Sequence, residues 1–269
     1  MKHLAHELLV PAGSRFKLSE IDPSDTRGME KNHAVARLEK NRERLAALQY
    51  LLYAEAKRAL LIVLQGIDAA GKDGAISHVM TGMNPQGVVV TAFKQPDGAE
   101  KRHDYLWRVH NAVPEYGKIG IFNRSHYEDV LIARVHNLVP QAVWSKRYRQ
   151  IDDFERMASE NGVQIVKFLL YISKDEQERR FRARIDDKKK NWKFSEADLH
   201  ERQYWDQYID AFNDAVRKCN APYAPWYVIP ANRKWFRNFA VTDILIHTLE
   251  SMKPKLPQPL GDLSNIRFE

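Results

Sequence analysis

The sequence contains a single cysteine, Cys219, in a chain of 269 residues. A disulfide within the chain is therefore impossible, and a reducing compartment is the simplest expectation. The chain also lacks an apolar run long enough to cross a bilayer, and its first residues, MKHLAHELLVPAG, lack the apolar core of a signal peptide. We therefore expect a cytoplasmic protein with no membrane partner.

Acidic residues are fewer than basic ones, with 35 Asp and Glu against 42 Lys and Arg, which gives a net charge of +7. This excess indicates an anionic partner, for which nucleotide, polyphosphate, nucleic acid and lipid headgroup are the alternatives. A basic protein without such a partner is the alternative unless the charges cluster. Internal repeats and low-complexity segments are absent, and a hydrophobic content of 44% is sufficient for a large core.

Hydrophobic patterns predict strands that alternate with helices along most of the chain. Unbroken apolar runs predict strands at Leu60–Leu64, Val88–Phe93, Lys118–Phe122, Val163–Ile172 and Trp226–Ile229. Helical spacing and helix breakers predict helices at Glu30–Lys57, Lys72–Met83, Lys101–Val113, Pro140–Asn161 and Lys234–Met252. This alternation is typical of an α/β domain with a central, mainly parallel sheet.

Two segments depart from the alternation. Residues 1 to about 30 are polar and contain Pro and Gly, which predicts an extended arm. With the following amphipathic helix this arm makes up residues 1–58, packed on a main domain of residues 59–269. Between about 174 and 220, two helix-like runs follow each other with a lysine-rich connection and no strand. We expect a single domain overall, with this last segment as a helical lid.

The segment Leu60–Gly74 combines a buried strand with a phosphate-binding loop. Gly66, Gly71 and Lys72 have the spacing G-x-x-x-x-G-K between an apolar run and a predicted helix. Such a loop directs backbone N–H groups and a helix N-terminus toward phosphate, and its lysine adds a positive charge. We therefore expect phosphate or polyphosphate to bind at Gly66, Ala69, Ala70, Gly71, Lys72 and Asp73.

The loop contains two aspartates that need separate interpretations. Asp73 occupies the position where the motif has a magnesium-binding Ser or Thr, so other groups must hold any metal. An acidic residue in a first helical turn is favourable in itself, and this is the preferred interpretation of Asp73. Asp68 is either a turn residue or a group that binds metal or orients the attacking group. Because a bare carboxylate would repel phosphate, we favour the functional role for Asp68.

A second polar segment, Ile121–Val130, follows the third predicted strand. Ligands of parallel sheets bind beyond the carboxyl ends of the strands, so we expect this segment beside the loop. Where a magnesium-binding aspartate is usual, the chain has Asn123, and Glu128 is the carboxylate that would replace it. We expect nucleotide contacts from Asn123, Arg124, Tyr127 and Glu128.

Three residues of this segment have alternative roles. Arg124 either binds phosphate in a bidentate manner or forms a structural salt bridge. Asp129 is interpreted as the N-cap of the next helix. We expect His126 to be structural.

A third constellation is basic and lies in the predicted lid. It comprises Arg179, Arg180, Arg182, Arg184, Lys188, Lys189, Lys190 and Lys193, opposed only by Glu178, Asp186 and Asp187. Such runs are usually solvated helix faces. Arg180 and Arg184, however, share one helical face and are placed to close over a polyanion at the loop.

Four stretches of the chain together resemble the polyphosphate kinase 2 family. They are GIDAAGKDG, FNRSHYEDV, SKDEQERRFRARIDDKKKNWKFSEADLHERQYWDQY and APWYVIPANRKWFRN, in family order between about Asp22 and Leu249. The resemblance implies a three-layer, P-loop kinase-like α/β fold with a helical lid. It also implies reversible, magnesium-dependent phosphoryl transfer between inorganic polyphosphate and nucleotides, above all AMP and ADP.

The resemblance also implies roles for individual residues. The family's loop aspartate, loop lysine and two lid arginines fall on Asp68, Lys72, Arg180 and Arg184. Its K-x-W-K lid text matches Lys190, Trp192 and Lys193. The aspartate of its second motif falls on Asn123, so the metal role of that position does not carry over. Asn123 with Glu128 resembles the subgroup called class III, which phosphorylates both nucleoside mono- and diphosphates.

A phosphate oxygen of AMP or ADP is already ionised at neutral pH, so transfer requires alignment and charge cancellation, without a strong base. We expect Asp68 and Glu128 to hold Mg2+ or Mn2+. The groups expected to grip phosphate oxygens are Lys72, Arg124, Arg180 and Arg184, and those expected to follow the polyphosphate chain are Lys188, Lys189, Lys190 and Lys193. Trp192 is expected to stack on the base, with core packing as its alternative.

Two other functions are compatible with a phosphate-binding loop. An ATP-dependent nucleoside monophosphate kinase shares the loop, lid and sheet. A nucleic-acid-binding P-loop protein is less consistent, because the basic residues concentrate beside the loop and no nucleic-acid motif is present. We expect a homo-oligomer with no nucleic-acid partner.

Overall fold

The computed structural model describes residues 4–259 and 261, and its centre is a five-stranded sheet in the order β2-β3-β1-β4-β5. Every pair of neighbouring strands is parallel. The strands are β1 (Ala59–Gln65), β2 (Val88–Ala92), β3 (Ile119–Asn123), β4 (Val163–Tyr171) and β5 (Trp226–Pro230). The predicted α/β class with a parallel sheet is confirmed.

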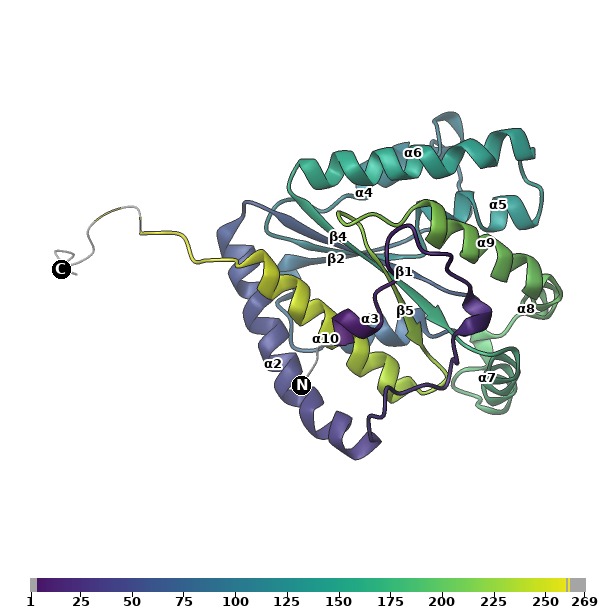
Figure 1. Cartoon of the computed structure of the whole chain (residues 1–269), viewed down its shortest axis with the longest axis horizontal. Coiled ribbons are helices and arrows are strands. Elements are labelled where there is room, and N and C mark those ends of the chain that lie inside the picture. The colour runs from purple at the N-terminus through teal and green to yellow at the C-terminus, as the bar shows by residue number, and fades with distance from the viewer. Residues whose placement is uncertain (1–3, 260, 262–269) are drawn as a thin grey trace.

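Helices cover both faces of the sheet and complete three layers. They are α1 (Leu4–Glu7), α2 (Lys31–Glu55), α3 (Lys72–Met80), α4 (Trp107–Ala112), α5 (Ile132–Val135), α6 (Gln141–Glu160), α7 (Lys174–Asp186), α8 (Glu196–Glu201), α9 (Trp205–Lys218) and α10 (Lys234–Met252). Figure 1 shows α6 and α9 on one side of the strands and α2 and α10 on the other. Short 3-10 turns lie at Leu18–Glu20, Pro85–Gly87, Glu100–Arg102, His126–Asp129, Asn191–Lys193 and Arg202–Tyr204.

The alternation of side chains in β1 explains why this strand is apolar throughout. Leu60 and Ile62 join the hydrophobic cluster under α2, α3 and α10, whereas Leu61 and Val63 join the cluster under α6 and α9. Successive side chains of a strand point to opposite faces, and both faces of this sheet are covered. The result is a rigid, buried strand whose carboxyl end carries the phosphate-binding loop.

β2 was predicted as a buried strand, and this was wrong for part of its length. Val89 and Val90 are 42% and 41% exposed. β2 forms one edge of the sheet, so it has a neighbouring strand on only one side. An apolar run does not reveal whether a strand will be central or at an edge, because that depends on the strand order.

The predicted helix at Lys101–Val113 is interrupted. A 3-10 turn covers Glu100–Arg102, and α4 is limited to Trp107–Ala112. Between them, the side chain of Asp104 accepts a hydrogen bond from the backbone N–H of Leu106 at 2.9 Å. This local bond gives the backbone an alternative to the helical ladder.

The N-terminal arm pairs with the sheet. Leu9 forms an antiparallel bridge with Tyr227 of β5, and the backbone N–H of Val10 donates to Trp226 O at 2.9 Å. Leu4, Leu8 and Leu18 are buried. The arm therefore pairs with the outer edge of β5. Without it, unpaired backbone groups at this edge would favour aggregation.

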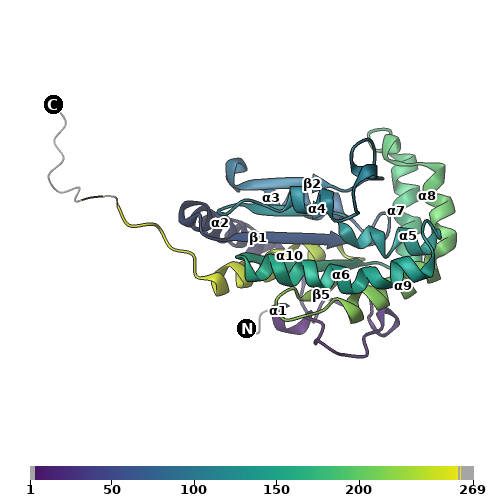
Figure 2. The same cartoon turned by 90° about the horizontal axis from the view of Figure 1, so that it is seen from above.

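The predicted lid segment is helical and contains α7, α8 and α9. Figure 2 shows α7 and α8 beyond the carboxyl ends of the strands. α9 differs from them because it packs on the sheet: Phe212, Ala215 and Val216 are buried in the hydrophobic cluster under α6 and α9. No helix in the described part of the chain is long and apolar enough to span a membrane.

Candidate active site

The loop between β1 and α3 curls tightly around its own lysine. Ala69 and Gly71 adopt left-handed backbone conformations, with φ of 63° and 103°. A Cβ on Gly66 would lie 2.6 Å from Leu170 O of β4, so only glycine fits this position. The Lys72 ammonium donates to Gly66 O at 2.5 Å and to Ile67 O at 3.3 Å. The α3 N-terminus and one positive charge thus meet at the loop, as in a phosphate cradle.

Lys72 is held in a site that is unfavourable for an unpaired charge. Its side chain is buried, and burial lowers its pKa, as does the positive charge of Arg124. Asp68, Glu128 and Asp73 act in the opposite direction. A phosphate group in the loop would supply additional negative charge where the lysine is desolvated.

Arg124 joins the two carboxylates that were expected to hold metal. Its guanidinium lies 2.8 Å from Asp68 Oδ1 and 3.8 Å from Glu128 Oε2. Burial opposes the charged form of Arg124, but Glu128 and Asp68 outweigh it and raise its pKa. Its φ of 61° is rare for a residue with a side chain, and such strain is common at functional sites. Arg124 therefore forms the salt bridge that was one of its two predicted roles, and its binding of phosphate stays a prediction.

The neighbouring carboxylates of Glu128 and Asp129 have different partners, Arg124 for the first and Arg147 for the second. Burial raises the pKa of Glu128, while Arg124 and Lys72 lower it. The interpretation of Asp129 as a helix N-cap was wrong, because its carboxylate accepts a hydrogen bond from Arg147 of α6 at 2.9 Å. Burial raises the pKa of Asp129 to about 6 despite Arg147. This carboxylate fastens the turn to α6.

Asn123 connects the second polar segment to the loop. Its side-chain amide donates to Asp73 Oδ1 at 2.9 Å, and the ammonium of Lys193 lies 4.0 Å from the other oxygen of Asp73. The residue at the usual Ser or Thr position of the motif thus links β3, the loop and the lid. Asp73 is otherwise exposed, in the first turn of α3.

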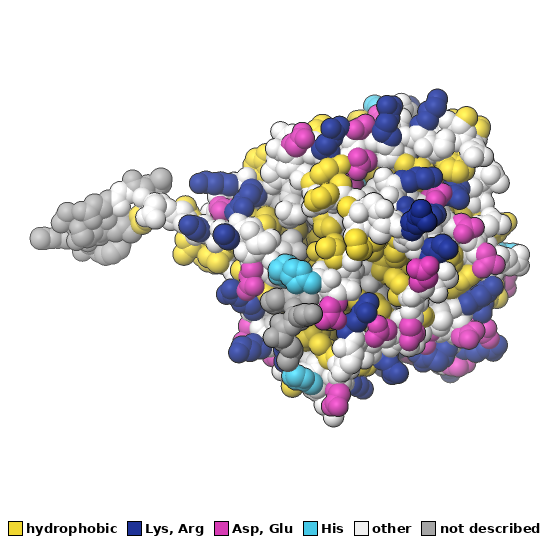
Figure 3. All heavy atoms as spheres, in the orientation of Figure 1, with side chains coloured by type: hydrophobic (Ala, Val, Ile, Leu, Met, Phe, Trp, Pro, Cys, Tyr) yellow, Lys and Arg dark blue, Asp and Glu magenta, His cyan; other side chains and the backbone are white. Residues whose placement is uncertain are grey.

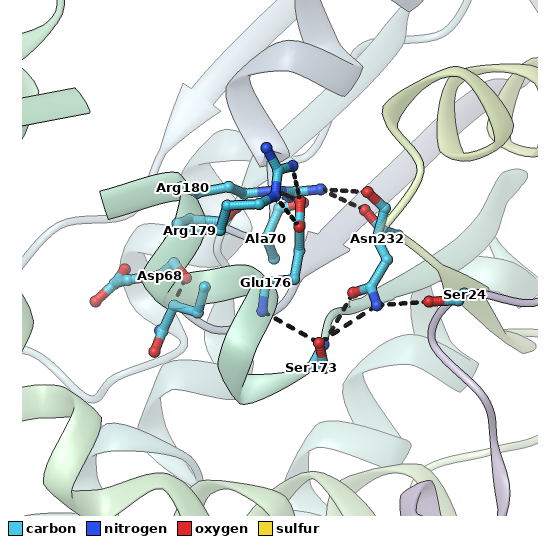
Figure 4. Close-up of polar contacts among 11 residues, drawn as sticks. Ser24, Asp68, Ala70, Ser173, Glu176, Arg179, Arg180 and Asn232 are labelled. Atoms are coloured by element: carbon cyan, nitrogen blue, oxygen red, sulfur yellow. Dashed lines mark hydrogen bonds and ion pairs between the residues drawn. The ribbon is translucent and has the colours of Figure 1, made fainter. Parts of the chain in front are cut away.

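The guanidinium of Arg180 is occupied by hydrogen bonds to the surrounding backbone. It is 6% exposed, and its guanidinium donates to four backbone oxygens, those of Ala69, Ala70, Ala231 and Asn232. Its Nε donates to Glu176, which also pairs with Arg179 (Figure 4). Asn232 in turn is bonded to Ser173 and Ser24. In this arrangement Arg180 binds the backbone of the loop and of the connection between β5 and α10, rather than presenting a free guanidinium as expected.

The other lid residues separate into two groups. Arg184, Lys190, Trp192 and Lys193 line the same cleft as the loop. Trp192 is 74% exposed, so core packing does not account for it. Lys188 and Lys189 are exposed and do not line this cleft. The structure therefore brings only part of the predicted lysine track to the loop.

Tyr127 was predicted to contact the nucleotide, but its side chain lies in the core. Its side chain is fully buried, and its hydroxyl donates to Glu155 at 2.9 Å and accepts from Lys167 at 2.9 Å. His126 is also buried and contacts Glu155, which agrees with the structural role expected for it. Tyr127 faces the core because the 3-10 turn at His126–Asp129 directs successive side chains to different sides.

The cleft beside the loop has a volume of about 810 Å³. Its walls come from the loop, the carboxyl ends of β2 and β3, the lid and α10. A smaller cavity of about 40 Å³ adjoins it at Asp68 and Arg124 and has an aromatic wall from α9, formed by Trp205, Tyr208 and Phe212. Asp68 and Arg124 line both cavities and lie where they meet.

Sequence reasoning missed three cations of the cleft, Lys94, Lys234 and Arg237. Lys234 and Arg237 lie in the first turn of α10, shortly after β5. The carboxyl end of a parallel strand faces the ligand, so basic residues three apart in the helix after β5 were a signal that would have found them. It also missed Gln177, whose amide donates to the backbone oxygen of Asp68 at 3.0 Å.

A parallel sheet with a glycine-rich loop between its central strand and a helix, closed by basic helices, defines a kinase-like P-loop phosphotransferase. A sequence profile described as "Polyphosphate kinase 2 (PPK2)" matches residues 28–257. The chain belongs to the polyphosphate kinase 2 family.

Individual relatives agree with this assignment. The chain is 52% identical over 252 residues to the AMP/ADP-polyphosphate phosphotransferase of Meiothermus ruber, covering 93% of this chain and 94% of that protein. It is 49% identical to an ADP-polyphosphate phosphotransferase of Rhodopseudomonas palustris, with coverages of 80% and 79%. The crystal structure of polyphosphate kinase 2 from Arthrobacter aurescens TC1 superposes with a TM-score of 0.94 at 45% identity, covering 98% of this chain and 94% of that one.

Proposed function

We propose that this protein transfers the terminal phosphoryl group of inorganic polyphosphate to AMP and ADP, reversibly and with a divalent metal ion. The similar proteins named above as AMP/ADP- and ADP-polyphosphate phosphotransferases support the substrates. The single structural observation that carries the proposal is the cleft at the loop, which is lined by cations from the loop, α7, the lid and α10. A polyanionic donor requires an excess of positive charge along its path.

In this proposal the chain's own groups align and neutralise the reacting phosphates. Lys72 and the loop amides hold the donor's terminal phosphoryl group, and Arg124 holds the acceptor phosphate where the two cavities meet. The acceptor oxygen is already ionised, so no general base is required. Arg180 would act by fixing the loop backbone, and Arg184, Lys190 and Lys193 would contact the donor from the lid.

The carboxylates near the loop fit a magnesium ion that shares its ligands with substrate. Among the described residues no group of three or more His, Cys, Asp or Glu side chains is placed to hold a metal. Magnesium commonly uses one or two carboxylates together with phosphate oxygens and waters. Asp68 and Glu128, both adjacent to Arg124, meet that requirement. A bound ion would neutralise charge on the phosphates during transfer.

The proposal is tested by incubating purified protein with magnesium, polyphosphate and either AMP or ADP, with no ATP added. We expect ADP to form from AMP and ATP to form from ADP, measured by chromatography of the nucleotides. Omitting polyphosphate is the control for disproportionation of ADP. If neither product depends on polyphosphate, the proposed donor is wrong.

Asp68 is expected to matter through the metal. In an Asp68→Asn variant we expect kcat to fall by about 100-fold, because an amide is a weaker magnesium ligand than a carboxylate. We also expect the magnesium concentration for half-maximal activity to rise. Asp153→Asn, on the exposed face of α6, is the matched control. An Asp68→Asn enzyme with the wild-type magnesium dependence would contradict the assignment of Asp68.

The two rival functions are less consistent with the surface of the molecule. An ATP-dependent kinase would need a pocket for the donor's base beyond the phosphates, whereas cations from α10 are added to those of the loop and lid in this cleft. For nucleic acid, a broad basic face would be expected. In Figure 3, basic and acidic side chains are interspersed over the face shown.

A further inference from the structure

Arg237 is a buried guanidinium without a carboxylate partner in the described part of the chain. It is 3% exposed, and its Nε and Nη2 donate to the amide oxygen of Asn238 at 3.0 and 2.7 Å. No described residue accepts a hydrogen bond from its Nη1. Burial, together with the positive charge of Arg180, lowers the pKa of Arg237 to about 10. A buried charge without an opposite partner is costly, which is typical of a group that awaits a ligand.

The guanidinium of Arg237 lies directly against the phosphate-binding loop. A Cβ on Gly71 would lie 1.9 Å from Nη1, and a Cβ on Gly74 would lie 3.1 Å from Nη2. Both glycines therefore leave room for this side chain. Arg237 follows β5 whereas Arg124 follows β3, and these strands lie on opposite sides of β1. The two arginines thus approach the loop from opposite sides.

Lys234 adds a second cation on the same side. It is one helical turn before Arg237 and lines the same cleft. Burial lowers its pKa, and Arg180, Arg237 and Arg179 lower it further. The nearby carboxylate of Glu176 is already paired with Arg179 and Arg180. The first turn of α10 therefore presents positive charge that the surrounding side chains do not neutralise.

We propose that Arg237 and Lys234 form a second phosphate subsite, which holds a phosphoryl group of the donor chain beyond the one held at Lys72. The inference rests on the proposed function and specifies how the donor is recognised. A polyphosphate chain carries negative charge on every residue, so its next groups would pair with these cations. The subsite would thus bind the donor chain at the phosphoryl group next to the one held at Lys72.

The test compares wild type with Arg237→Gln, Lys234→Met and the exposed control Lys40→Met. KM is measured for tripolyphosphate, for long-chain polyphosphate and for ADP, and binding of long-chain polyphosphate to nucleotide-free protein is measured by calorimetry. We expect Arg237→Gln to weaken binding and raise KM for long-chain polyphosphate about tenfold, and Lys234→Met about threefold. KM for ADP should stay within about twofold in both, and Lys40→Met should resemble wild type.

Two results would overturn the subsite. One is unchanged polyphosphate binding in the folded variants, and the other is an equal rise of both KM values, which would indicate a distorted loop. If Arg237→Gln does not fold, the exposed Lys234→Met variant decides the question by the same criteria. Wild-type protein that binds polyphosphate but transfers nothing would refute the proposed function alone, since calorimetry would still judge the subsite. Wild-type protein that does not bind polyphosphate would refute the subsite.

Discussion

Replacing Lys72 with methionine is expected to lower kcat/KM for phosphoryl transfer from polyphosphate by about 1,000-fold. Methionine retains the unbranched apolar stem and loses the charge inside the loop. The ammonium now lies within the curl of the loop, bonded to Gly66 O and Ile67 O, where a phosphate would be surrounded by backbone amides. Steady-state kinetics with saturating magnesium measure the effect.

The Lys72→Met variant needs evidence that only the charge was lost. Lys40→Met, on the exposed face of α2, makes the same chemical change at a distance from the loop. Circular dichroism and thermal melting should show both variants folded. If Lys72→Met retained transfer within about tenfold of wild type, the loop would not be the site of phosphoryl transfer.

The second large effect concerns stability. Lys167 of β4 is fully buried, and its ammonium contacts Glu155, Tyr127 Oη at 2.9 Å and Cys219 O at 2.7 Å. Burial would raise the pKa of Glu155, but Lys167 and His126 together outweigh it and lower that pKa. We expect Lys167→Met to reduce the free energy of unfolding by about 3–5 kcal/mol, because it leaves a buried carboxylate without its cation. Urea unfolding at pH 7 measures the loss.

A double variant distinguishes a lost ion pair from a packing defect. Lys167→Met/Glu155→Leu removes both charges, so we expect it to be more stable than Lys167→Met alone. Burial without Lys167 would raise the pKa of Glu155 in the folded state above its unfolded value. The single variant should then recover part of its stability as the pH falls from 7 to 5, since the folded state binds the proton more tightly. A loss below about 1 kcal/mol at pH 7 would contradict the pair's importance.

This buried network also has a place in the site. Tyr127 and His126 both contact Glu155, and they belong to the turn between Arg124 and Glu128. Asp129 fastens the same turn to Arg147 of α6. The two residues that face the loop are thus held from behind by groups that never reach the cleft. Precise placement of a strained residue such as Arg124 requires this kind of support.

The phosphate-binding loop was accessible from sequence for a local reason. Leu60–Gly74 contains its strand, its glycines and its lysine within one short stretch, so spacing alone predicts the geometry. The structure places Asp68, Arg124 and Glu128 within one cluster, as the position of their segments after β1 and β3 predicted. Their chemical roles remain predictions.

Side-chain direction in the short turns was not accessible in the same way. Tyr127 and Asp129 flank Glu128 in the sequence, yet both point away from the loop, toward Glu155 and Arg147. A 3-10 turn has no long hydrophobic period from which the buried side can be identified. Only the packing of α6 against this turn decides which of the polar residues faces the substrate.

The sequence by itself determined the α/β class, the phosphate-binding loop and the family, because each depends on local spacing or on text that relatives share. Tertiary structure alone decided what each cation does. Arg180 is hydrogen-bonded to backbone oxygens and paired with Glu176, whereas Arg237 is buried beside Gly71 with a free Nη1 among the described residues. In the sequence both are arginines of helices near the cleft. They differ in their hydrogen-bond partners, because different segments fold against them. Burial and partners set the charge that is left for a ligand, and these follow from contacts between residues far apart in the chain.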